Sequence, residues 1–233
     1  MLLFIAVYLE RCFIQIMKTI MINLSFQNEI LFFELLSGQK SIQEFEKNIY
    51  ENDLLENEIG SENYLKLISF DYKGDLSELF TIVENQIIKE YRFESWKVQQ
   101  TLEVFISDPE NLDKHLNEIY NLYFGVGKES GKREYDFKFL KHLALNYFYW
   151  LDEGYLKMNF GENWEKEYQE NIKHFDFYHQ QLKPFSELIL SALDNKDIEI
   201  LENGTYNITE KLKEELELKD VYQLQHPLRV DIK

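Results

Sequence analysis

Cysteine is almost absent from this chain, which has a single one, Cys12, among 233 residues. One cysteine excludes an intramolecular disulfide framework and the paired-cysteine motifs of zinc and redox sites. A chain without disulfides suits a reducing compartment, so we expect a cytoplasmic protein. Proline and glycine are also scarce, at 3 and 9 residues. So few turn-forming residues favour long helices over a turn-rich β fold.

Positive charge is the second shortage. The 25 lysines and arginines stand against 42 aspartates and glutamates, which gives a formal net charge of −17. A surface this negative repels nucleic-acid phosphates and anionic lipid headgroups, so we expect neither a nucleic-acid partner nor a membrane partner. The charge favours a cationic protein partner. It also has a simpler explanation, because net charge by itself keeps a protein in solution.

The sequence begins with an apolar stretch, MLLFIAVYLERCFIQIMKTIM, which Glu10 and Arg11 interrupt. A bilayer-spanning helix needs about 20 predominantly apolar residues, and the longest clean run here is shorter. No basic stretch precedes the run and no Ala-x-Ala-like cleavage site follows it, which argues against a signal peptide. Residues 1–20 therefore form a leader with two interpretations: a buried first helix, or a segment upstream of a natural start at Met17 or Met21.

Helix start and stop signals divide residues 21–124 into several helices. Ser25 is a suitable N-cap and Gly38 ends the helix that follows it. Ser41 and Glu44 have the spacing of a capping box, and Asp53 can cap a short helix. Further helices are expected from Ser61 to near Gly74, from Asp75 to near Arg92, where the apolar spacing breaks, from Trp96 to Phe105, and from Asp108 to Gly125.

A loop at residues 125–136 separates this N-terminal part from a C-terminal part at 137–233. There we expect a buried central helix, a helix that ends before Pro184, and a β-hairpin over 198–209, where two β-prone runs flank Glu202-Asn203-Gly204. The expected fold is mainly α, a multi-helix bundle-like domain with a small hairpin near the C-terminus. The two parts form either two units or one compact domain.

Familiar catalytic motifs are missing: the sequence has no GxSxG, no GxGxxG and no phosphate-binding Gly-Lys-Ser/Thr loop. His174, Asp176 and His179 are candidate metal ligands by residue type. Their spacing argues against a shared site, because ligands four residues apart lie on one side of a helix and ligands five apart do not. We therefore expect a protein that is not an enzyme, with no catalytic residue, no cofactor and no bound metal.

Aromatic residues are concentrated in the C-terminal part. They could line a ligand pocket or pack in the core, and core packing is the commoner role at helical spacing. Base stacking is disfavoured, because nucleic-acid sites interleave aromatic residues with lysine and arginine, and here the interleaved residues are acidic. The set comprises Tyr147, Phe148, Tyr149, Trp150, Tyr155, Phe160 and Trp164.

Acid is concentrated between Ser41 and Asn63, where seven carboxylates stand against one basic residue, Lys47. No histidine or cysteine lies nearby to supply a base, a nucleophile or a metal ligand, so catalysis is the weakest interpretation. Two of the acids, Glu44 and Asp53, have local capping roles. The others form either a binding face or a solvated surface: Glu46, Glu51, Glu56, Glu58 and Glu62.

One stretch has a recognisable shape: FELLSGQKSIQEFEKNIYENDLLENEIGSENYLKLISFDYKG. A short helix and Gly38 precede Ser41-Ile42-x-x-Phe45-Glu46 and an aromatic residue at Tyr50, and an acidic LLENEIG and YLKLISFDYK follow. This pattern, at about residues 31–74, resembles the small acidic immunity proteins encoded beside polymorphic and contact-dependent toxins in bacteria. The resemblance implies a protein that binds and neutralises a cognate toxin, and it transfers no binding residue.

Three hypotheses follow. The first is a cytoplasmic immunity protein that blocks a basic toxin, such as a nuclease, through its acidic glutamates, since charge complementarity speeds association and adds specificity. The second is a helical regulatory or scaffold protein that acts through protein contacts, with Ile198–Lys219 as a winged-helix-like remnant. The third is a metal-dependent enzyme that uses His174, Asp176 and His179.

Overall fold

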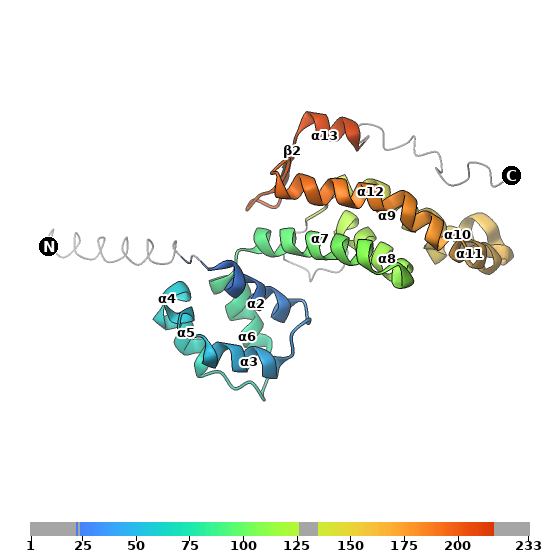
Figure 1. Ribbon diagram of the computed structural model, residues 1–233. Coiled ribbons are helices and arrows are strands. Elements are labelled where there is room, and N and C mark those ends of the chain that lie inside the picture. The colour runs from blue at the N-terminus through green and yellow to red at the C-terminus, as the bar shows by residue number, and fades with distance from the viewer. Residues whose placement is uncertain (1–21, 23, 126–134, 217–233) are drawn as a thin grey trace, which may run out of the picture. The chain divides into compact units, whose positions relative to one another are not determined.

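The computed structural model describes residues 22, 24–125 and 135–216 (Figure 1). This part is mainly α-helical, with a two-stranded antiparallel hairpin formed by β1 (Ile198–Ile200) and β2 (Tyr206–Ile208), which confirms the predicted fold class. The leader at 1–20 and most of the loop at 125–136 lie outside the described residues. No helix among the described residues is long and apolar enough to cross a membrane.

The chain divides into two compact units, residues 1–93 and residues 94–233. The division falls within α7 (Glu90–Ser107), close to Arg92, where the apolar spacing of the sequence breaks. It does not coincide with the loop at which the sequence placed its boundary. The reason is that α8 (Leu112–Phe124) and α9 (Lys141–Leu151), on either side of that loop, pack extensively against each other. The loop therefore connects two elements of one unit.

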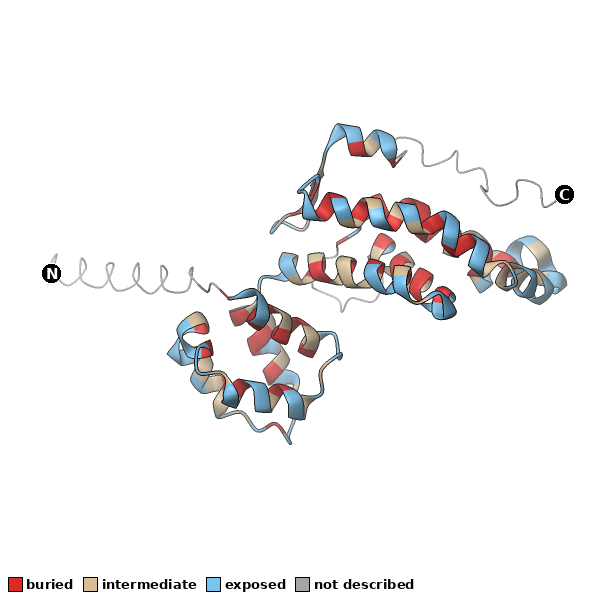
Figure 2. Cartoon of the chain, viewed as in Figure 1, coloured by how far each residue is buried: buried red, intermediate tan, exposed pale blue. Residues whose placement is uncertain are grey.

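The first unit is a group of short helices around a single apolar core, and their buried positions face inward (Figure 2). Phe32, Phe45 and Ile49 are fully buried at its centre, and the two phenylalanine rings meet edge to face at 5.7 Å. The elements are α2 (Phe26–Leu36), α3 (Ile42–Glu51), α4 (Leu55–Ile59), α5 (Ser61–Ile68) and α6 (Ser77–Ile82), followed by a π-helical turn at Val83–Ile87.

The predicted capping box of α3 is present. Ser41 Oγ accepts a hydrogen bond from the Glu44 amide at 3.3 Å, and the Glu44 carboxylate accepts one from the Ser41 amide at 3.1 Å. Gly38, the predicted stop of the preceding helix, has a φ of 73°, a conformation that favours glycine. Sequence signals that span only a few residues therefore predict the end of α2 and the start of α3 correctly.

The prediction that Asp53 caps the next helix is wrong. Helix α4 begins at Leu55, and its N-cap position, Leu54, makes no side-chain capping bond. Instead Oδ1 of Asn52 accepts a hydrogen bond from the Leu54 amide at 3.2 Å. Asparagine closes such turns by bonding to the backbone two residues on, so it competes with the neighbouring aspartate for the same role.

The second unit packs its longer helices around a core that includes Phe105, Leu116, Phe139 and Leu143, all at most 1% exposed. Histidine side chains connect distant parts of the unit. For example, a ring nitrogen of His142 lies 2.9 Å from the Leu216 carbonyl oxygen. The remaining elements are 3-10 turns at Pro109–Asn111, Lys138–Leu140 and Gly161–Asn163, and the helices α10 (Glu153–Phe160), α11 (Trp164–Ile172), α12 (Phe175–Asp194) and α13 (Glu210–Glu215).

The prediction that a helix ends before Pro184 is wrong, because α12 continues through this proline to Asp194. Proline has no N–H to donate to the carbonyl four residues earlier, which disfavours a helix interior. The apolar side of α12 nevertheless stays buried on both sides of it, at Leu182 and Ile189. Tertiary packing of this side outweighs the local preference.

A pair of leucines on α5 tests the burial pattern of the first unit. Leu67 is fully buried, whereas Leu65 is 58% exposed. We expect Leu67→Ala to lower the free energy of unfolding of this unit by about 2–5 kcal/mol, because it leaves a cavity in the core. Leu65→Ala changes it by less than about 0.5 kcal/mol. Hydrogen exchange of the α2 and α3 amides measures the free energy of unfolding of the first unit alone. Equal losses of this free energy in the two variants contradict the burial pattern.

Candidate functional site

The five candidate glutamates lie on three consecutive short helices. Glu51, Glu56 and Glu62 are exposed, whereas Glu46 and Glu58 are half-buried. We name Glu44–Glu62 the acidic segment. Helix α5 packs against both α3 and α4, so the structure brings the three helices together. Their placement is Glu46 and Glu51 on α3, Glu56 and Glu58 on α4, and Glu62 on α5.

Glu58 has a structural role. Its Oε2 accepts hydrogen bonds from the Ser25 amide at 2.8 Å, from the Ser25 hydroxyl at 3.1 Å and from the Asn28 side chain at 2.8 Å. Ser25 is the N-cap of α2, as predicted, but its own side chain makes no capping bond. Glu58 therefore brings negative charge from another helix to the N-terminus of α2, where the helix dipole favours it. Asn28 in turn accepts a hydrogen bond from Asn52 at 2.6 Å.

These bonds make the acidity of Glu58 part of the fold. Burial raises the pKa of its carboxyl, but the hydrogen bonds from Asn28 and Ser25 outweigh burial and leave the pKa below its ordinary value of 4.5. Because the folded pKa is lowered, the bonds stabilise the fold above pH 4.5. That stabilisation is lost as the pH falls through the lowered pKa. Glu58 is thus the least available of the five glutamates for a partner.

Two of the other glutamates have ion pairs within their own helices. Glu62 lies 2.8 Å from the ammonium of Lys66, and Glu51 lies 3.9 Å from that of Lys47. The Glu51 and Lys47 side chains are each about two-thirds exposed. Exposed pairs of this kind contribute little to stability, so a cationic partner can replace them at small cost.

Glu46 and Glu56 have different surroundings. Ser61 donates a hydrogen bond to Glu56 at 2.6 Å. Within the described residues no hydrogen bond or ion pair holds Glu46. Burial, followed by the charges of Tyr50 and Glu46, raises the pKa of the Tyr72 hydroxyl. Glu46 and Tyr50 are four residues apart on α3 and so lie on one side of that helix, and the Glu46 carboxylate is the least engaged of the five.

Large apolar side chains are exposed beside these acids. Tyr50, Leu54 and Leu65 are 52%, 67% and 58% exposed. Tyr50 belongs to the pattern on which the family resemblance rests, but sequence reasoning did not predict that Leu54 or Leu65 is exposed, although a signal for Leu54 was there. Leu55 and Ile59 are four residues apart and share the buried side of α4, so the adjacent Leu54 must point elsewhere.

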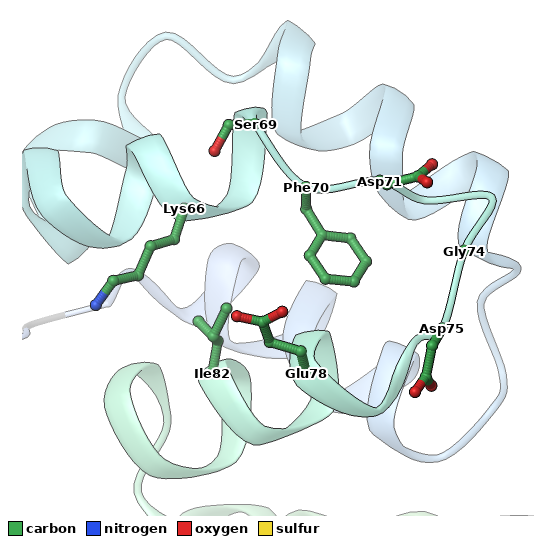
Figure 3. Close-up of a pocket in the computed structure, with 8 residues that line it drawn as sticks. All are labelled: Lys66, Ser69, Phe70, Asp71, Gly74, Asp75, Glu78 and Ile82. Atoms are coloured by element: carbon green, nitrogen blue, oxygen red, sulfur yellow. The ribbon is translucent and has the colours of Figure 1, made fainter.

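A depression of about 300 Å³ adjoins the acidic segment where α5 ends and α6 begins (Figure 3). The Phe70 ring points into it, and Glu78 and Ile82 of α6 lie opposite. Lys66 lines its other side and pairs with Glu62, so the depression is continuous with the acidic segment. None of its lining residues is a histidine or a cysteine: Lys66, Ser69, Phe70, Asp71, Gly74, Asp75, Glu78 and Ile82.

Two of the three candidate metal ligands of the second unit, His174 and His179, have other contacts. A ring nitrogen of His179, which is 4% exposed, lies 2.8 Å from the Phe105 carbonyl oxygen. The His174 ring lies edge-on to Tyr178 at 6.2 Å, and Asp176 is exposed. Among the described residues no group of three or more histidine, cysteine, aspartate or glutamate side chains is placed to hold a metal ion.

The aromatic set of the second unit lies partly at the surface. Core packing is confirmed for Trp150, which is buried with its ring 4.6 Å from that of Tyr178. The other members are only half-buried, so full core burial is not found for them. Neighbouring helical residues point about 100° apart, so the consecutive rings of residues 147–149 cannot all face the core.

Comparisons of the chain with protein-family models, with curated proteins and with solved structures find no match. The resemblance to immunity proteins therefore stays a prediction. The functional argument rests on the side chains described above, which offer carboxylates and apolar groups on short, mutually supported helices.

Loss of the Glu58 carboxylate leaves Ser25 and Asn28 without their acceptor. We expect Glu58→Ala to lower the free energy of unfolding of the first unit by about 1–2 kcal/mol at neutral pH, the size of a lost N-cap. The difference from wild type shrinks as the pH falls below 4.5, because wild type then loses the same bonds. Glu51→Ala is the control, since its exposed pair contributes little. Hydrogen exchange at neutral pH and below pH 4.5 measures the free energy of unfolding of the two variants. Equal losses in Glu58→Ala and Glu51→Ala contradict the structural role of Glu58.

Proposed function

We propose that this chain is an inhibitor of the immunity type, which binds a basic protein toxin and blocks it by occupying or distorting its active site. The observation that carries the proposal is the composition of the acidic segment and its immediate continuation, where exposed carboxylates accompany Tyr50, Leu54 and, just beyond the segment, Leu65. Protein interfaces combine a few large apolar or aromatic anchors with a polar rim.

Charge supports a basic partner. Between Ser41 and Asn63 seven carboxylates stand against Lys47 alone. Two of the seven, Glu44 and Glu58, are engaged in helix capping, which leaves an excess of negative charge on the outside of the helices. Such a surface attracts a positively charged protein during diffusion and repels wrong partners of like charge.

The helices also present these groups in a fixed arrangement. The Tyr50 hydroxyl donates a hydrogen bond to the Ile68 carbonyl at 2.9 Å, which ties α3 to the end of α5. The bonds between Asn52 and Asn28 and between Asn28 and Glu58 tie α3 and α4 to α2. A surface that is already ordered loses less entropy on binding, which favours affinity. Inhibition by such a surface needs no catalytic group, cofactor or metal.

The alternative, a regulatory or scaffold protein, is supported by one observation. The hairpin of β1 and β2, which the sequence predicted, is followed directly by α13. Deletion of residues 198–233 distinguishes the two functions. Loss of partner binding on this deletion, with no toxin involved, favours the alternative.

The protein encoded beside this chain supplies the test of the proposal. We expect the purified full chain to form a stoichiometric complex with that neighbouring toxin, to abolish its activity, and to protect cells that express it. Binding weakens as salt is added, because screening shortens the reach of the charges. A neighbour that shows no salt-sensitive binding and leaves cells unprotected would sink the proposal.

A charge-neutral variant locates the binding surface. We expect the combined change E46Q, E51Q, E56Q and E62Q to slow association with the toxin about 10-fold at low salt, and the difference to disappear at high salt. The control changes four exposed glutamates of the second unit, E162Q, E165Q, E187Q and E199Q, and so alters the net charge equally. Stopped-flow mixing measures both rates. Equal slowing by the two variants means that net charge, and not this surface, attracts the toxin.

A further inference from the structure

The second unit has an aromatic surface that the proposed function does not use. Tyr120 lies at its centre: its ring is 4.8 Å from that of Phe124, 5.2 Å from that of Tyr147 and 6.2 Å, in a stacked geometry, from that of Phe148. Tyr155 continues the set, 4.8 Å from Phe148. Phe124 is 45% exposed and the others are half-buried. We name these five residues the tyrosine patch.

The core of the unit does not require these rings. The buried side chains of α8 follow helical spacing along one side: Leu112, His115, Leu116, Ile119 and Tyr123. Tyr120 and Phe124, four residues apart, form a separate row beside that side. Half-exposed aromatic rings are typical of protein interfaces, where they bury large areas at low entropic cost. The patch therefore has the composition of a docking surface.

Acidic side chains border the patch. Burial, followed by the charge of Asp152, raises the pKa of Tyr120. Burial and Asp152 act in the same way on the pKa of Tyr147, to which Asp113 also contributes. Asp152 caps α10, and its carboxylate accepts a hydrogen bond at 2.7 Å from the amide of Tyr155, a member of the patch. Asp113 lies on α8 seven residues before Tyr120, so helical spacing places it on the same side of α8 as that ring. The ring faces are themselves electron-rich and attract cations.

The chain already places one cation on the margin of the patch. The ammonium of Lys138 lies 4.5 Å from the centre of the Tyr123 ring and 5.3 Å from that of Phe124. It also lies 3.4 Å from the carboxylate of Asp136. A lysine held jointly by rings and a carboxylate shows which chemistry suits this surface.

We propose that the tyrosine patch is a second docking surface and that it takes an arginine-bearing segment of a protein partner. The planar guanidinium stacks on rings and donates hydrogen bonds to carboxylates at the same time, which an ammonium does less well. Asp113 and Asp152 repel nucleic-acid phosphates, and a second copy of a chain with a net charge of −17 is repelled as well. The inference concerns the second unit alone and stands without the acidic segment.

The test uses the full chain with E46Q, E51Q, E56Q and E62Q already in place, so that the acidic segment does not compete. A fluorescent peptide of arginines spaced by glycine and serine is the probe, and the same peptide with citrulline, a neutral analogue of arginine, is its match. D113N with D152N removes the bordering charges and keeps the rings. Asparagine also preserves the capping bond that Asp152 accepts from the Tyr155 amide at 2.7 Å. D176N with D194N, two exposed positions of the same unit, is the control.

We expect the arginine peptide to bind about 10-fold more tightly than the citrulline peptide, and D113N with D152N to remove most of that difference while the control keeps it. Ring resonances of Tyr120 and Tyr147 shift on binding. Equal affinity for the two peptides, equal binding by the two double variants, or unshifted ring resonances overturns the proposal. So does preferential binding of an apolar peptide, or self-association of the chain through these rings. Neither double variant alters a ring, so the result does not depend on the folding of a ring-deletion variant.

Discussion

One carboxylate, that of Glu58, holds the acidic part of the first unit in place. It accepts all three hydrogen bonds offered by Ser25 and Asn28 at the start of α2, and Asn28 extends the link to Asn52 after α3. Helices of five to eleven residues are marginal alone, so their geometry depends on such links and on the apolar core beneath. The N-terminus of α2 offsets the negative charge of Glu58, so this carboxylate can be held there. By fixing α4 against α2, Glu58 also fixes the position of the neighbouring glutamates.

The parts of the fold that sequence predicts well are those decided by neighbouring residues. The capping box of Ser41 and Glu44 spans four positions, and the turn before α8 is set by Asp108, whose side chain accepts a hydrogen bond from the Glu110 amide. One error, at Asp53, is itself local, because Asn52 takes the capping role instead. The others lie where distant contacts decide. Glu58 meets Ser25 across 33 positions of sequence, and α12 passes through Pro184 because its packing against other helices outweighs a local preference.

For the candidate site, composition locates the acids but does not rank them. Nothing in the sequence distinguishes Glu51 from Glu58 as a candidate. In the structure Glu51 has one ion pair, at 3.9 Å from Lys47, whereas Glu58 accepts three hydrogen bonds. The exposure of an apolar residue is easier to predict from the sequence than the availability of an acid. The spacing of Leu55 and Ile59 defines the buried side of α4, and Leu54 does not lie on it. The tyrosine patch depends on rings from α8, α9 and α10 meeting one another, and no periodicity within one helix reveals such a meeting.

The two proposed surfaces select positive charge by different physics. The acidic segment acts at long range, because its carboxylates are mostly exposed and their field extends to about 8–10 Å at physiological salt. It therefore governs how fast a basic partner arrives. The tyrosine patch acts only on contact, because the attraction of a cation to a ring requires an approach within about 6 Å. It therefore governs how long a bound segment stays, which is where most differences in affinity arise. In this proposal the two surfaces complement each other, since charge alone attracts every basic protein and cannot distinguish among them.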